Sequence, residues 1–299
     1  MKWERTGRRK MKEGKNSLKT ILVQRKIADR KISDRKKSEI RIADGKIVGR
    51  KNESGIKEII NRWKLVVNNF MDIICPMTCP MCDKILDKNE KICTVCDKKL
   101  VYIFEPKCKK CGKELENERL EYCIDCSVKK HYFKTGIAAF KYDSMVSKSI
   151  YKFKYHNRRT YALFYGDAIS KVYGSEIRRW SCDVIIPVPI HNKRRIKRGY
   201  NQAELIAREL SVKLGIPMDA KYMFRVGNTR PMKELDKTAR KKNVEKAFKI
   251  YKNVVKYKKI ILVDDIYTTG STLDACAKTL LEAGATEIYF VSLSVGQGI

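Results

Sequence analysis

The chain has 299 residues, a length typical of about two domains. Hydrophobic residues make up 43% of it, enough for a globular core, but no run approaches the ~18 apolar residues of a membrane-spanning helix. No apolar segment follows the basic N-terminus, so we expect neither a transmembrane helix nor a signal peptide. The formal net charge of +32 favours encounters with polyanions, although a Lys-rich proteome with a basic tail would give the same value.

Residues 1–58 are basic and have few side chains that could be buried. Lys and Arg far outnumber Asp and Glu there, and isolated Ile and Val residues stand among them. Such a segment is expected to stay disordered or to form a transient helix. Its composition fits a nucleic-acid-binding arm and equally an extension upstream of a later start at Met71. Residues 59–74 then become amphipathic, which predicts a helix that docks on the module that follows.

Four C-x-x-C pairs follow between residues 75 and 126. They are Cys79/Cys82, Cys93/Cys96, Cys108/Cys111 and Cys123/Cys126. Tetrahedral zinc needs two such pairs, so the set predicts two structural Zn²⁺ ions in a reducing cytoplasm rather than disulfides or a redox motif. The simplest arrangement is sequential, and a cross-braced one (first pair with third, second with fourth) also fits. This module could serve to stabilise the fold, or it could bind a nucleic acid or a protein, and both roles are open.

The next residues alternate between predicted strands and helices. Strands are expected at 136–142 and 183–189, and helices at 150–156, at 161–173 and from about 200 to 214. Between the second strand and the last helix lies a basic stretch, 193–198. A basic loop after a parallel strand is a suitable place for a pyrophosphate group. The candidate pyrophosphate-binding residues are Pro187, Val188, Pro189, Arg194, Arg195 and Arg198.

A long polar excursion follows, from residue 227 to 244. In an α/β domain such a segment is typical of a binding loop or lid. Arg225, Arg230 and Arg240 could reach the phosphates of a ligand when it closes. Further strands are expected at 248–251 and 286–293.

The most informative stretch is 260–273. Its first four residues are a short apolar run, which predicts a strand buried on both faces, as in a parallel sheet. Asp264 and Asp265 come next, and a helix with an apolar face starts near Leu273. Ser271 or Thr272 suits its N-cap, and Ser271 with Asp274 fits a capping box.

The turn between this strand and the helix predicts an anion site. It consists of Thr268, Thr269, Gly270, Ser271 and Thr272. A strand-to-helix turn presents unpaired N–H groups and the positive end of a helix dipole, which suit a phosphate. Asp264 and Asp265 suit vicinal sugar hydroxyls, directly or through a divalent ion. Phosphate on one side and a diol on the other indicate a ribose 5-phosphate.

This motif resembles the phosphoribosyl pyrophosphate (PRPP) motif of type I phosphoribosyltransferases. Two other interpretations of the acids are a buried strand that ends in solvated carboxylates and a Walker B strand. The second requires a G-x-x-x-x-G-K-[ST] loop, which the sequence lacks.

The chain as a whole resembles the ComF family, in which a cysteine module precedes a phosphoribosyltransferase-like domain. The matching stretches are Cys79–Cys82, Pro187–His191, Arg198–Gln202, Arg240–Phe248 and Asp264–Thr272. The resemblance implies binding of PRPP with Mg²⁺ and a role in natural transformation, the uptake of single-stranded DNA. One residue departs from the family pattern, since Met232 stands where its flexible loop has Gln.

We therefore expect an open, mostly parallel α/β sheet of the type I phosphoribosyltransferase kind with an N-terminal zinc module. The expected organisation is a basic extension over 1–58, a helix plus double zinc ribbon over 59–130, and the phosphoribosyltransferase-like domain over 131–299. Two functions remain: a cytoplasmic enzyme that transfers ribose 5-phosphate from PRPP, with Asp264 and Asp265 as catalytic residues, and a non-catalytic adaptor that senses PRPP or handles single-stranded DNA. Nothing in the sequence names the acceptor.

Overall fold

The computed structural model describes residues 76–226, 247–251 and 256–296. All described residues belong to one of the chain's two units, Asn69–Ile299. The predictions for residues 1–58, for the helix over 59–74 and for the loop over 227–244, with Arg230, Met232 and Arg240, lie outside the described residues. None of the described helices is long and apolar enough to cross a membrane.

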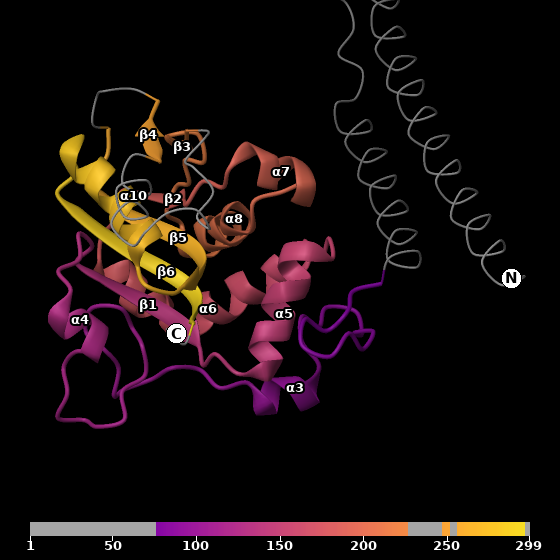
Figure 1. The fold of residues 1–299 in the computed structure, drawn as a ribbon. Coiled ribbons are helices and arrows are strands. Elements are labelled where there is room, and N and C mark those ends of the chain that lie inside the picture. Colours follow the sequence, from indigo (N-terminus) through magenta and orange to yellow (C-terminus); the bar gives the residue numbers. More distant parts are fainter. Residues whose placement is uncertain (1–75, 227–246, 252–255, 297–299) are drawn as a thin grey trace, which may run out of the picture. The chain divides into compact units, whose positions relative to one another are not determined.

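A four-stranded parallel sheet forms the centre of the second unit (Figure 1). Its strands, in spatial order, are β1 (Thr135–Phe140), β6 (Glu287–Val295), β5 (Lys259–Tyr267) and β2 (Val184–Pro187). Most of their side chains are buried on both faces, which is why their sequences are nearly continuous apolar runs. The predicted open parallel sheet is thus confirmed.

Helices cover both faces of this sheet. On one face α5 (Ser144–Tyr155), α6 (Tyr161–Arg179) and α8 (Gln202–Leu214) contribute to one apolar cluster. On the other face α10 (Ser271–Glu282) contributes to a second cluster. The helix α5 begins six residues earlier than the predicted 150, because the side chain of Asp143 caps it by accepting a hydrogen bond from the N–H of Val146 (2.7 Å).

Two elements between β2 and β5 differ from the sequence prediction. The basic stretch expected as a loop is a short helix, α7 (Asn192–Arg198). The Nδ1 atom of His191 accepts a hydrogen bond from the N–H of Lys193 at its start, and Gly199 ends it with φ +77°. A hairpin of β3 (Met223–Arg225) and β4 (Phe248–Ile250) follows, and only its second strand was predicted.

The two halves of the cysteine module pack on opposite faces of the sheet. The first, which contains α3 (Thr94–Lys99), shares the apolar cluster of α5 and α6. The second, which contains α4 (Ile124–Val128), shares the cluster of α10. The second half comes very close to β1, since a Cβ atom on Gly112 would lie 2.7 Å from the carbonyl oxygen of Gly136. Each half therefore completes the core on its own side of the sheet.

Candidate functional site

The two acids lie at the carboxyl end of β5, inside the strand and not in the loop after it. The strand continues to Tyr267 because Ile266 and Tyr267 still pair with β6. Consecutive residues of a strand point to opposite faces, and the neighbours of the acids reflect this. Asp265 makes an ion pair with Lys154 of α5 (2.9 Å), whereas Asp264 lies on the α10 side of the sheet.

The pKa of the Asp264 carboxyl group is strongly shifted. Burial, and then the negative charge of Asp265, raise the pKa of Asp264 to about 7. The charges of Lys154 and Arg225 act in the opposite direction, as does the hydrogen bond that Asp264 Oδ1 accepts from the N–H of Asp265 (2.8 Å). Arg225 is itself unusual, because its Nε atom is buried and has no hydrogen-bond partner among the described residues. Lys154 thus pairs directly with Asp265, and the charge of Arg225 from a different element acts on Asp264.

The turn after β5 leads directly into α10. The N-cap is Gly270, with φ +71° and no side chain to cap the first turn, so the prediction of Ser271 or Thr272 as N-cap is wrong. The hydroxyl of Ser271 instead contacts that of Thr269 (2.9 Å). A Cβ atom at residue 270 would lie 2.6 Å from Tyr267 Oη, so the turn requires glycine for both its backbone angle and its space. Among the described residues, no side chain therefore caps the first N–H groups of α10.

A partly buried cluster of three polar side chains, Lys129, His131 and Asp274, supports this turn. The predicted capping role of Asp274 is also wrong, because its carboxylate contacts His131 Nδ1 (3.0 Å) and Lys129 Nζ (2.8 Å) instead. The ammonium of Lys129 also donates to the carbonyl oxygen of Thr269 (2.8 Å). Although burial alone would raise the pKa of Asp274, the hydrogen bonds with His131 and Lys129 lower it below its usual value.

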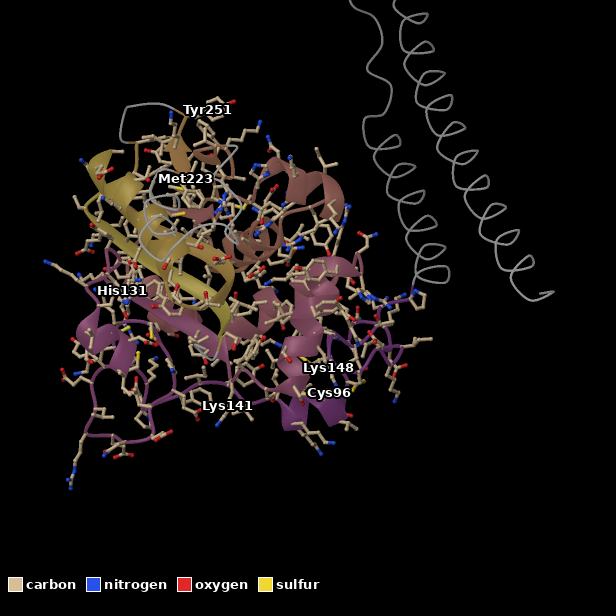
Figure 2. All side chains as sticks on the ribbon, in the orientation of Figure 1. Cys96, His131, Lys141, Lys148, Met223 and Tyr251 are labelled. Carbon is tan, nitrogen blue, oxygen red and sulfur yellow. The ribbon has the colours of Figure 1, made fainter. Side chains whose placement is uncertain are left out.

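No motif in the sequence marks this cluster. Lys129 and His131 come a few residues after the last cysteine of the module, and His131 is labelled in Figure 2. The one signal was Asp274 itself, an acid within the apolar face of α10, where a buried partner is required.

The predicted pyrophosphate-binding residues are the backbone segment Pro187–Pro189 at the end of β2 and the three arginines of α7. Val188 continues the ladder, donating to the carbonyl oxygen of Val263 (2.9 Å), and its own carbonyl accepts from Asn201 Nδ2 (3.0 Å). Arg194 and Arg195 are exposed on α7. Arg198 is engaged elsewhere, because its guanidinium donates to Gln202 Oε1 and to Tyr155 Oη (3.1 and 3.2 Å).

A cavity of about 870 Å³ opens beside the carboxyl end of β2. It is lined by Pro187, Pro189 and Arg195 and by the β3–β4 hairpin, where Figure 2 labels Met223 and Tyr251. Asp264, Asp265 and the turn over 268–272 do not line it. Arg225 connects the two regions, since it lines the cavity and its charge acts on Asp264.

The eight cysteines form two separate groups of four, in the sequential arrangement. One contains Cys79, Cys82, Cys93 and Cys96, and the other Cys108, Cys111, Cys123 and Cys126. In each group the sulfur atoms lie within 4.8 Å of one another. The Sγ–Sγ distances of 3.7 Å for Cys82–Cys93 and Cys111–Cys123 match the ~3.8 Å edge of a tetrahedron with Zn–S bonds of about 2.3 Å. All eight thiols are free, so both groups fit zinc and exclude disulfides.

Comparison with known proteins agrees with this architecture. Residues 70–127 match the model of the double zinc ribbon domain, and residues 169–295 match that of the phosphoribosyl transferase domain. Competence protein F of Haemophilus influenzae is 32% identical over 209 residues, which cover 68% of this chain and 90% of that protein. This chain belongs to the ComF family.

Other relatives of this ComF-family chain are similarly distant. Competence protein ComFC of Bacillus subtilis is 28% identical and covers 67% of this chain and 82% of its own length. DNA utilization protein YhgH of Escherichia coli K12 is 28% identical, with coverages of 66% and 87%. The fold is thus a parallel sheet of the phosphoribosyltransferase kind behind a double zinc ribbon.

The cysteine geometry predicts two zinc ions per chain. Metal analysis of the purified protein by plasma mass spectrometry should find this stoichiometry, and Cys111→Ser should lower it to one, because a site with three thiolates binds zinc more weakly. The control is Cys182→Ser, which changes a cysteine outside both groups and should keep both ions. Full zinc retention by Cys111→Ser would contradict the assignment.

The turn at Gly270 predicts a stability loss that depends on Tyr267. Gly270→Ala should lower the free energy of unfolding by about 1–2 kcal/mol for the positive φ alone, and further because of the overlap with the Tyr267 hydroxyl. Gly215→Ala is the matched control, since Gly215 also has a φ of +72° but no atom within 4 Å of the added Cβ. Urea denaturation measures both, and equal losses would show that the contact with Tyr267 has no effect.

Proposed function

We propose that the carboxyl end of β5 binds PRPP with Mg²⁺ and that the protein transfers its ribose 5-phosphate to an acceptor, with release of pyrophosphate. One observation carries this proposal: two adjacent acids lie near the carboxyl end of a parallel strand that leads, through a glycine at φ +71°, into a helix whose N-cap residue provides no side-chain cap. The 5-phosphate would lie at residues 268–272. Asp264 and Asp265 would hold the ribose hydroxyls.

The charges around the acids favour an anionic ligand. With a pKa near 7, Asp264 is partly protonated at neutral pH. The remaining negative charge is offset by Lys154 and Arg225, so the ligand-free site does not strongly repel phosphate. Arg194 and Arg195 on α7 add exposed positive charge on the side of β2, where the pyrophosphate group would lie.

Magnesium fits this donor set. Mg²⁺ is usually held by one or two carboxylates together with the phosphates of a substrate, and Asp264 and Asp265 supply carboxylate oxygens at the strand end. When bound, the ion neutralises the charge that develops on the departing pyrophosphate.

In the reaction a nucleophilic atom of the acceptor forms a bond to the anomeric carbon, and the bond from that carbon to pyrophosphate breaks. Positive charge develops on the sugar as the leaving group departs. The carboxylates of Asp264 and Asp265, fixed by the ladder of β5, would stabilise this charge. The acceptor is not identified by any residue of the site.

The names of the relatives point to a biological process, the uptake and use of DNA. Proteins named for competence and for DNA utilization are similar over two thirds of this chain. We infer a role in DNA uptake, with single-stranded DNA and proteins of the competence machinery as partners. The free thiols of the zinc ribbons suit the reducing cytoplasm. We also propose that the domain boundaries lie near residues 58 and 130.

Isothermal titration calorimetry with PRPP and MgCl₂ tests the proposed site. The double variant Asp264→Asn/Asp265→Asn should bind PRPP at least about tenfold more weakly, because lost hydrogen bonds to charged groups contribute about 1.5–3 kcal/mol each. Glu282→Gln, an exposed acid at the far end of α10, is the control and should bind like the wild type. Unchanged binding by the double variant would refute the assignment.

A second candidate function is a non-catalytic adaptor that senses PRPP or binds single-stranded DNA. The exposed basic residues of α7 favour it. The same wild-type preparation distinguishes the two in a screen for pyrophosphate release from PRPP with nucleobases and single-stranded DNA. Release that disappears in the double variant supports the enzyme. Steeply salt-dependent DNA binding without any release supports the adaptor.

A further inference from the structure

Lys154 is a cation in the site that no sequence motif marked. It lies near the C-terminal end of α5, and its ammonium is 2.9 Å from Asp265 Oδ1. Both side chains are only 17% exposed, so the pair is largely screened from solvent. Because consecutive carboxylates repel one another in such surroundings, a cation beside them stabilises their ionised forms.

The end of α5 that carries Lys154 is held by the segment Arg198–Gln202. Tyr200 Oη donates to the carbonyl oxygen of Phe153. Gln202 Nε2 lies 3.3 Å from the same oxygen and 3.4 Å from the carbonyl oxygen of Lys154. These carbonyls belong to the last turn of the helix, where no intrahelical N–H is available for them.

The same segment fixes two further neighbours of Lys154. Arg198 lies over the ring of Tyr155, at 4.9 Å from its centroid, and donates to its hydroxyl. Asn201 donates to the carbonyl oxygen of Val188, in the predicted pyrophosphate segment. Both Asn201 and Gln202 are buried polar side chains, whose hydrogen bonds are costly to leave unmade. One segment thus sets the position of Lys154 relative to both Asp265 and the end of β2.

We propose that Lys154 binds a phosphoryl oxygen of the ligand and that the segment Arg198–Gln202 positions it to do so. An ammonium has three N–H donors, and the ion pair with Asp265 uses one of them. The ligand class is a phosphorylated sugar bearing a pyrophosphate, so this inference rests on the proposed function.

A comparison with Lys152 indicates that the ion pair of Lys154 does more than hold α5 in place. Lys152 pairs with Asp83, which follows Cys82 in the first half of the cysteine module, and this carboxylate also accepts from Tyr161 Oη (2.7 Å). That pair ties α5 to the zinc ribbon and lies away from β5. Two lysines of one helix therefore make similar ion pairs, and only that of Lys154 reaches the carboxyl end of a parallel strand, where ligands of such sheets bind.

Calorimetry with PRPP and MgCl₂ on the full-length protein compares Lys154→Met with Lys152→Met. Lys154→Met should bind about tenfold more weakly, because it loses a charge-assisted hydrogen bond to phosphate. Lys152→Met, which also removes one ion pair from α5, should bind within about twofold of the wild type. Lys154→Arg should restore most of the affinity, which a purely structural role would not require.

A second variant tests the positioning without changing Lys154. Tyr200→Phe removes only the hydroxyl that holds the carbonyl oxygen of Phe153, and it should weaken PRPP binding by about threefold or more. This variant keeps the inference testable should Lys154→Met fail to fold. Wild-type affinity in Tyr200→Phe would refute the positioning role.

The outcomes separate the two proposals. Wild-type protein that binds no PRPP would overturn the proposed function and this inference together. Wild-type binding with unchanged affinity in Lys154→Met would overturn the inference alone. Equal losses in Lys152→Met and Lys154→Met would also overturn it, because the effect would then come from the packing of α5.

Discussion

Strand β5 is the element on which the rest of the structure depends. It is hydrogen-bonded to β2 over its first half, up to Val263, and to β6 along its length as far as Tyr267, so pairing with β6 restrains its carboxyl end. That end carries Asp264 and Asp265, and the chain then passes within a few residues into α10. Because the strand points its side chains alternately to the two faces, the acids meet different neighbours: Lys154 from α5, and Arg225 from the hairpin.

The zinc ribbons are part of this arrangement and not an appended module. Each half supplies apolar residues to one face of the sheet, so binding of zinc and completion of the core are coupled. The residues that leave the second half also reach the site, since Lys129 holds the carbonyl oxygen of Thr269 and the carboxylate of Asp274. The turn that follows β5 is therefore supported by the segment that follows the zinc ribbon.

The sequence predicts those features of the fold that depend on the periodicity of apolar residues and on the spacing of cysteines. The sheet, its long helices and the use of the cysteines for zinc follow from apolar runs and C-x-x-C pairs, whereas the choice between sequential and cross-braced grouping came only from the structure. It did not predict features that long-range contacts decide. Pairing with β6 extends β5 past the acids, and His131 draws Asp274 away from the cap. Lys154 looked like any lysine of a basic helix until the fold placed it beside Asp265, more than a hundred residues along the chain.

The most direct measurement of the central claim is a crystal structure of the protein with PRPP and Mg²⁺. We predict that the 5-phosphate binds against the main-chain N–H groups at the start of α10, with the ribose hydroxyls facing Asp264 and Asp265. A ligand bound only in the cavity beside β2, with Asp265 still paired to Lys154 and no phosphate at the turn, would contradict it.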